Sequence, residues 1–150
     1  MRKKLDSLKA GTLLDGYRLE KSLGGGGFSV VYRARQLNND RPVVIKEYIP
    51  NKPAKRDRSG QVRARNEDTE GRFNRGRKLF FQEASTLATL KHTNIVDVFT
   101  FVQATGTVYM VKEYQPGENL QHYLQARRGG LSETFLRTVF PPLLDGLEQI

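Results

Sequence analysis

The sequence predicts an α+β fold in which antiparallel strands come first and helices follow. Short apolar runs with strand-like composition lie at residues 17–23, 28–34, 42–49, 94–101 and 108–114. An apolar pattern with helical spacing lies between the third and fourth runs, at residues 78–90. Further helices are predicted at 120–125 and from Ser132, which is a suitable N-cap. We therefore expect a five-stranded antiparallel sheet with one main helix, followed by further helices.

Composition excludes several classes of protein. The chain has 150 residues, of which 37% are hydrophobic, so it is long enough to fold around a core of its own. It contains no cysteine, which rules out disulfides, cysteine zinc sites and a cysteine nucleophile. The two histidines, His92 and His122, have no carboxylate at ligand spacing, so we expect no metal site among these residues.

The amino-terminal segment gives no sign of export or membrane insertion. No apolar run approaches the roughly 20 residues that a membrane-spanning helix needs. The first residues, MRKKLDSLKAGTLL, are basic but lack the continuous apolar stretch of a signal peptide. We expect a cytoplasmic protein with no membrane segment.

Positive charge is concentrated in one segment. Of the net charge of +9, residues 51–78 carry +6, from ten Lys and Arg against four Asp and Glu. Residues 50–75 are polar with little periodicity, so we read 51–77 as a basic insertion that is at least partly mobile. A nucleic-acid module is the alternative reading. It is disfavoured because RDRSGQVRARN has few aromatic residues for base stacking, and we expect no nucleic-acid partner.

Four consecutive glycines stand between two strands in LGGGGFSVVYRA, residues 23–34. A flexible spacer is one explanation, but strands follow closely on both sides. A strand–glycine–strand hairpin can lie over a polyphosphate and offer backbone N–H groups without interference from Cβ atoms. A dinucleotide fingerprint would need a helix next, and a P-loop would need Gly-Lys-Ser/Thr; neither follows.

One lysine and one glutamate complete a possible phosphate site. Lys46 shares a strand with Val44, and residues two apart on a strand point to the same face. Lys46 is therefore expected beneath the glycine hairpin, where a buried ammonium needs an anion. Glu83 borders the apolar stripe of the predicted helix, between Phe80 and Leu87. Each feature alone is weak evidence, but together and in this order they indicate a phosphate-gripping site.

These motifs resemble a bacterial-type serine/threonine protein kinase. LGGGGFSVVY is similar to the family's glycine-rich loop, and VVIK to its V-A-I-K strand. KHTNIV and VYMVKEYQPGENL resemble the segments that follow the main helix and form the hinge. The resemblance covers residues 16–150. It implies a kinase N-terminal lobe over 16–114, an extension at 1–15, and over 115–150 the hinge with the first helices of an incomplete helical C-terminal lobe.

The resemblance also implies a role for individual residues. ATP would be the cofactor, with Lys46 binding its α- and β-phosphates and Glu83 holding Lys46. The phosphates would lie under the run Gly24, Gly25, Gly26 and Gly27. The base and ribose would be contacted by Leu23, Val31, Val44, the backbone of Glu113 and Gln115, and Asn119.

Three positions depart from the family pattern. Ser29 replaces the third glycine, and Val44 stands where alanine is usual. Lys112 precedes the hinge, where an apolar residue or threonine is usual. Its ammonium could compete for Glu83, reach a phosphate or extend out of the pocket, and the sequence leaves these alternatives open.

The 150 residues contain neither H-R-D-x-x-x-x-N nor D-F-G, the motifs that supply the catalytic base and the Mg²⁺ ligands. We expect those ligands beyond residue 150 and expect the chain alone to be inactive as a kinase, being part of a longer enzyme with protein substrates. The exposed apolar stripe of the helix from Ser132 predicts self-association. A nucleotide-binding or scaffolding pseudokinase is the alternative function.

Overall fold

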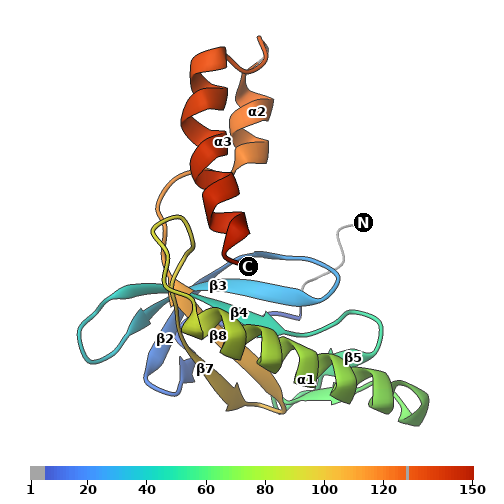
Figure 1. Cartoon of the computed structure of the whole chain (residues 1–150). Helices are drawn as coiled ribbons and strands as arrows, with labels where there is room; N and C mark the ends of the chain where they lie inside the picture. Colours follow the sequence, from blue (N-terminus) through green and yellow to red (C-terminus); the bar gives the residue numbers. More distant parts are fainter. Residues whose placement is uncertain (1–5, 128) are drawn as a thin grey trace. The chain divides into compact units, whose positions relative to one another are not determined.

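The computed structural model describes residues 6–127 and 129–150. Its main element is an antiparallel sheet with the strand order β1-β2-β3-β4-β8-β7 (Figure 1). The strands are β1 (Leu13–Leu14), β2 (Tyr17–Gly25), β3 (Ser29–Gln36), β4 (Pro42–Tyr48), β7 (Val98–Ala104) and β8 (Thr107–Glu113). The antiparallel sheet expected from the sequence is confirmed, with the two-residue β1 added at its edge.

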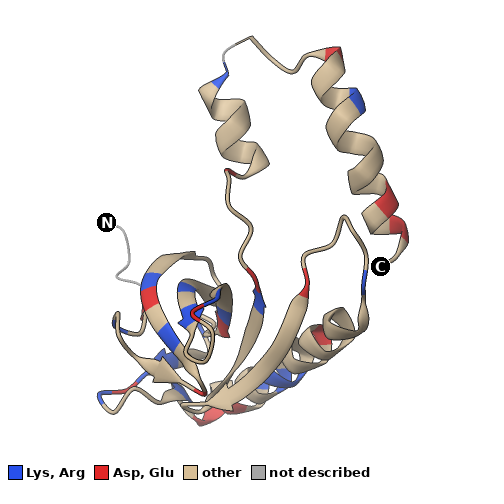
Figure 2. Ribbon diagram, turned by 90° about the vertical axis from the view of Figure 1, so that its left-hand side faces the viewer, with Lys and Arg blue, Asp and Glu red and all other residues tan. Residues whose placement is uncertain are grey.

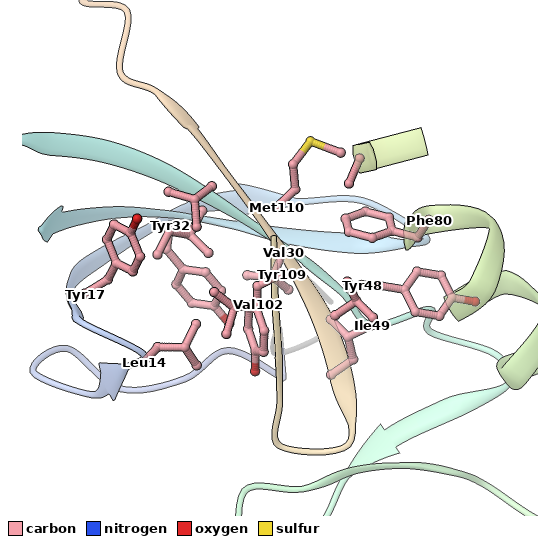
Figure 3. Close-up of a cluster of buried hydrophobic side chains, with 14 of the residues drawn as sticks. Leu14, Tyr17, Val30, Tyr32, Tyr48, Ile49, Phe80, Val102, Tyr109 and Met110 are labelled. Carbon is pink, nitrogen blue, oxygen red and sulfur yellow. The ribbon is translucent and has the colours of Figure 1, made fainter. Parts of the chain in front are cut away.

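The chain divides into two compact units. The first consists of Met1–Thr89 and Asp97–Tyr114, and the second of Leu90–Val96 and Gln115–Ile150. The first unit holds the sheet and the long helix α1 (Glu67–Thr89), which packs against β7 and β8. Its core joins both faces of the sheet; Tyr48 and Phe80 lie side by side in it, with ring centroids 5.6 Å apart (Figure 3).

Helix α1 begins at Glu67, not at residue 78 as the apolar pattern predicted. Its start is capped reciprocally: the Thr69 N–H donates to Asn66 Oδ1, and the Asn66 N–H donates to Thr69 Oγ1. Acidic residues in the first turn complement the helix dipole. Phe73 is the one buried residue in the added turns, and it stacks on Tyr48 with centroids 5.8 Å apart. A single apolar anchor is too little for periodicity to reveal.

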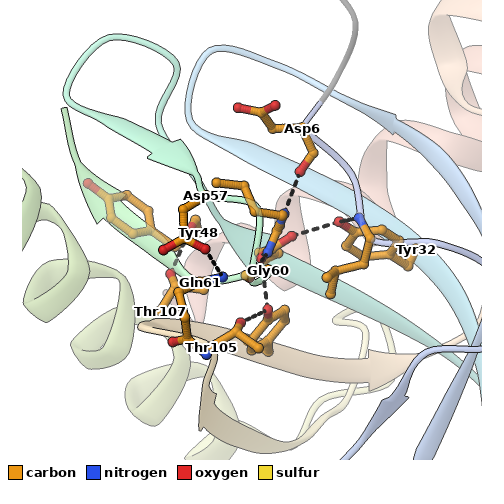
Figure 4. A network of polar contacts seen from close by, with 12 residues as sticks. Asp6, Tyr32, Tyr48, Asp57, Gly60, Gln61, Thr105 and Thr107 are labelled. Atoms are coloured by element: carbon orange, nitrogen blue, oxygen red, sulfur yellow. Dashed lines mark hydrogen bonds and ion pairs between the residues drawn. The ribbon is translucent and has the colours of Figure 1, made fainter.

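The basic segment before α1 also differs from the expected mobile insertion. It forms a small hairpin of β5 (Ala54–Arg56) and β6 (Val62–Ala64). Arg56 Nη2 pairs with the buried Glu47 of β4 at 2.6 Å, and the Val62 N–H donates to the Thr105 carbonyl at 2.7 Å. The polar contacts around this hairpin can be followed in Figure 4, near Gly60 and Thr105. Long-range contacts of this kind leave no periodic pattern in the sequence.

The second unit contains α2 (Leu120–Ala126) and α3 (Glu133–Glu148). The predicted cap is present, since the Phe135 N–H donates to Ser132 Oγ at 3.1 Å. Tyr123 stacks on Phe135, with ring centroids 4.5 Å apart. Several apolar residues of α3 are exposed: Leu136, Phe140, Leu143, Leu144 and Leu147. Within the described residues, no helix combines the length and apolar character that a membrane span requires.

Candidate functional site

The register of β4 brings four of the predicted site residues onto one face of the sheet. Lys46 lies opposite Val31 of β3 and opposite Met110 of β8. Val44 lies opposite Lys112 of β8. Directly opposed residues share a face, as do residues two apart on one strand. Val31, Val44, Lys46 and Lys112 therefore form a contiguous patch on the face that α1 covers in part.

The glycine run forms the end of β2 and the turn to β3. Gly24 lies opposite Val31 and has φ 139°, a conformation that residues with a side chain rarely adopt. A Cβ atom placed on Gly24, Gly26 or Gly27 would meet no atom within 4 Å. Packing within the chain therefore does not require these glycines, and their open side can accept a close approach by a ligand.

The tip of the glycine hairpin is attached to the end of β4. The Ile49 N–H donates to the Phe28 carbonyl at 3.0 Å, and the Asn51 N–H donates to the Gly27 carbonyl at 2.9 Å. The Phe28 side chain is 75% exposed at the tip. The hairpin tip is thus anchored by its backbone carbonyls, and Gly27 lines the same cavity as Lys46.

A cavity of about 910 Å³ lies between the hairpin tip, the end of β4 and α1. Lys46 and Glu83 both line it. Lys46 is half-buried, and its Nζ lies 5.4 Å from the centroid of the Phe80 ring. Glu83 is exposed, and the ion pairs among the described residues include none between these two. The structure brings both residues to one cavity with the clamp between them open.

Lys112 faces the same region as Lys46 and Glu83. It is half-buried, and burial lowers the pKa of its ammonium below the ordinary 10.5. The nearby Lys46 charge lowers this pKa further, while Glu83 acts in the opposite direction. Two lysines thus share the field of one carboxylate, an excess of positive charge that an anionic ligand would offset.

The remaining predicted residues are distributed over both units. In the first, Leu23 is 48% exposed and the Glu113 N–H donates to the Asp97 carbonyl at 2.9 Å. In the second, Asn119 caps α2, its Oδ1 accepting from the His122 N–H at 2.8 Å, and Gln115 is exposed. A role for Gln115 and Asn119 in binding stays a prediction.

Sequence reasoning missed three cations of the cavity: Lys52, Arg72 and Arg75. All three lie in the segment that was read as an insertion. A signal was present, because Arg72, Arg75, Leu79 and Glu83 follow the three-and-four spacing of one helix face. It would have been found by extending the helical pattern toward the amino terminus.

Comparison with known proteins supplies the family. The model of the protein kinase domain matches residues 17–150.

The chain belongs to the protein kinase family.

Two curated kinases illustrate the similarity. The chain is 31% identical over 137 residues to serine/threonine-protein kinase PLK4 of Aedes aegypti, covering 91% of this chain and 16% of that protein. It is 31% identical over 132 residues to serine/threonine-protein kinase pkn3 of Myxococcus xanthus, covering 87% of this chain and 21% of that protein. This kinase chain therefore spans about a fifth of the length of such relatives.

A solved kinase structure agrees with the fold. The apo form of PpkA-294 is 33% identical and superposes with a TM-score of 0.87, covering 94% of this chain and 50% of that one. The expected α+β architecture of a kinase N-terminal lobe, with two further helices, is thereby confirmed.

Proposed function

We propose that this chain is the nucleotide-binding lobe of a serine/threonine protein kinase and that its ligand is ATP. The observation that carries the proposal is the shared face of Val31, Val44 and Lys46 beside a glycine hairpin with an open outer side. Apolar residues that end at a lysine, under backbone donors, suit a purine joined to a polyphosphate. The names of the relatives support this assignment.

In this proposal each residue has a defined contact. Lys46 binds the α- and β-phosphates, and Glu83 on the facing helix orients its ammonium when the ligand is present. The glycine hairpin covers the phosphates with its backbone. The other contacts are those of Leu23, Val31 and Val44 to the base, the backbone of Glu113 and Gln115 to its edge, and Asn119 to the ribose.

Magnesium has no assigned ligand in this chain. Among the described residues, no group of three or more His, Asp or Glu side chains is placed to hold a metal ion. The family's metal-binding and catalytic-loop motifs do not occur in the 150 residues. Our proposal for the chain is therefore nucleotide binding, and transfer of the γ-phosphoryl group to protein hydroxyls is proposed for a protein that also supplies those motifs.

A second candidate is a nucleotide-binding or scaffolding pseudokinase. It is favoured by Lys112, which places a second cation beside Lys46, and by the open Lys46–Glu83 clamp. The two candidates differ in the role of Lys46, because a scaffold has no need of a phosphate-binding lysine.

The test is the thermal stability of the chain with and without ATP, compared with Lys46→Met. A ligand at 100 times its Kd stabilises the folded state by about 2.7 kcal/mol. We expect Lys46→Met to lose about tenfold or more in affinity, because it removes a charge-assisted phosphate contact. Lys55→Met is the matched control, since Lys55 is exposed on β5 and does not line the cavity. Equal ATP stabilisation of all three proteins would contradict the proposal.

A further inference from the structure

The cations of the basic segment fall into two groups in the structure. Arg56, Arg63 and Arg77 are engaged with Glu47, with Asp57 and with the Gly106 carbonyl, respectively. By contrast, the described residues offer no hydrogen-bond or ion-pair partner to Lys52, Arg72 or Arg75, and all three line the 910 Å³ cavity. Lys55, Arg58 and Lys78 also have no such partner among the described residues but do not line the cavity, so three of the six unpartnered cations of the segment face it.

Helix α1 displays two of these cations in line with Glu83. Arg72, Arg75, Leu79 and Glu83 are spaced by three or four residues and lie on one face of the helix. Lys and Arg positions recur along α1 (Figure 2). With a rise of about 1.5 Å per residue, Arg75 lies about 12 Å and Arg72 about 16 Å along the axis from Glu83. Lys52 approaches from the connection that follows β4.

The cavity is lined by both apolar and cationic side chains. Phe28, Tyr48, Leu79 and Phe80 are among the apolar ones, and Glu83 is the single carboxylate of its lining. Lys46 and Glu83 mark the end assigned to the nucleotide phosphates. The rest of the cavity is lined by the hairpin tip, the connection after β4 and the amino-terminal half of α1.

We propose that Lys52, Arg72 and Arg75 form a substrate subsite that selects protein segments with an anionic side chain near the acceptor hydroxyl. The inference rests on the proposed kinase function and names its substrate class. An extended peptide advances about 3.3 Å per residue, so 12 to 16 Å corresponds to about four or five residues. Guanidinium groups suit both carboxylates and phosphates, so Asp, Glu and phosphoserine share the recognising chemistry.

The test is the binding of fluorescent peptides to the intact protein, saturated with a non-hydrolysable ATP analogue. The peptides share one sequence around a serine and carry Ala, Glu or phosphoserine four residues before or after it. We expect the anionic peptides to bind about tenfold more tightly than the Ala peptides, as for a charge-assisted contact. The Glu and phosphoserine arms distinguish an acidic from a previously phosphorylated substrate.

The variant Arg72→Ala/Arg75→Ala should remove this preference and leave the affinity for the Ala peptides unchanged. Arg58→Ala/Lys78→Ala removes the same charge outside the cavity and should retain the preference. Lys52→Glu, on a connection rather than a helix, tests the subsite if the double variant does not fold.

A preference that is absent in the wild-type protein, survives the substitutions at Arg72 and Arg75, or falls equally in the control would overturn the inference. The inference would also be overturned if Arg72→Ala/Arg75→Ala lost binding to a random RNA oligonucleotide but kept the peptide preference, because the patch would then be a nucleic-acid site. Thermal stabilisation by ATP in the same preparation separates the two proposals: if it is absent, the nucleotide function itself fails.

Discussion

Lys46 and Glu47 are consecutive residues of β4, but they face opposite sides of the sheet and have opposite surroundings. Glu47 is fully buried, and its carboxylate accepts hydrogen bonds from Tyr32 at 2.6 Å and Tyr109 at 2.8 Å and pairs with Arg56 at 2.6 Å. Lys46 is half-buried, faces a cavity, and has the Phe80 ring at 5.4 Å. The charge on one face of β4 is paired within the chain, and the charge on the other face lines a cavity with no ion-pair partner among the described residues.

The Glu47 side also connects distant segments. Tyr32 Oη accepts from the Leu8 N–H at 2.9 Å, and Arg56 donates to the carbonyls of Asp6 and Gly60 (Figure 4). Burial, followed by the Glu47 charge, raises the pKa of both Tyr32 and Tyr109. The comparison teaches that neighbouring charges on one strand can differ completely in their surroundings, and it supports our proposal that Glu47 serves stability and Lys46 serves binding.

The largest expected effect comes from breaking the satisfied side. Glu47→Ala leaves Arg56 buried without its carboxylate and should reduce the free energy of unfolding by about 3–5 kcal/mol. Lys46→Met is the matched comparison on the other face and should change it by about 0.5 kcal/mol or less. Urea denaturation of both variants measures the difference. Equal losses would show that the two faces do not differ in this way.

A double variant sharpens this result. Replacing Glu47 and Arg56 together by apolar residues should cost less than Glu47→Ala alone, because no uncompensated charge stays buried. A double loss equal to the sum of the single losses would mean that the two side chains act independently.

The second effect concerns the aromatic packing beside Lys46. A Cβ atom on Gly76 of α1 would overlap the Tyr48 hydroxyl oxygen and lie 2.9 Å from its Cζ. Gly76→Ala should therefore destabilise the chain by about 1–3 kcal/mol, because the ring or the helix must move. Gly71→Ala, in the same helix with no atom within 4 Å, should instead stabilise it by up to about 1 kcal/mol.

Thermal denaturation of the two glycine variants measures these changes. If both variants gained stability, the close contact between Gly76 and Tyr48 would not constrain the helix.

The smallest effect concerns the charge excess on the open side. The pKa of Lys112 is lower in the folded than in the unfolded chain, so between the two values the unfolded state binds more protons and stability rises with pH. Lys112→Met removes this dependence. The stability of the variant relative to the wild type should therefore be greatest at neutral pH and should shrink as the pH rises toward 10.5, the ordinary pKa of lysine, measured by urea denaturation. A difference that is constant with pH would contradict the burial of this ammonium.

ATP affinity gives a second reading of the same variant. If Lys112 competes with Lys46 for Glu83, Lys112→Met should tighten ATP binding. Unchanged or weaker ATP binding would contradict the idea that Lys112 competes with Lys46 for Glu83. The predicted effect of Lys112 on stability would not be affected by that result.

Patterns in short stretches of the sequence were enough to predict much of the fold and several residues of the candidate site. Alternating and β-branched runs predicted the strands of the sheet, and the spacing of Phe80, Ala84 and Leu87 predicted the second half of α1, because these signals arise from residues close in the chain. The glycine run, Lys46 and Glu83 could also be found in order. Strand alternation then placed Lys46 on the face of Val44, as the structure has it.

The tertiary structure alone decided the rest. Glu47 looked like an ordinary strand residue, and its burial depends on Arg56, Tyr32 and Tyr109, which lie far from it in sequence or on other strands. The amino-terminal half of α1 has one buried apolar residue, Phe73, which stacks on Tyr48, so its sequence shows no helical period of apolar residues. The placement of Arg72 and Arg75 at the cavity follows from that packing. Contacts between distant segments determine which charges are satisfied, and a sequence read locally does not contain them.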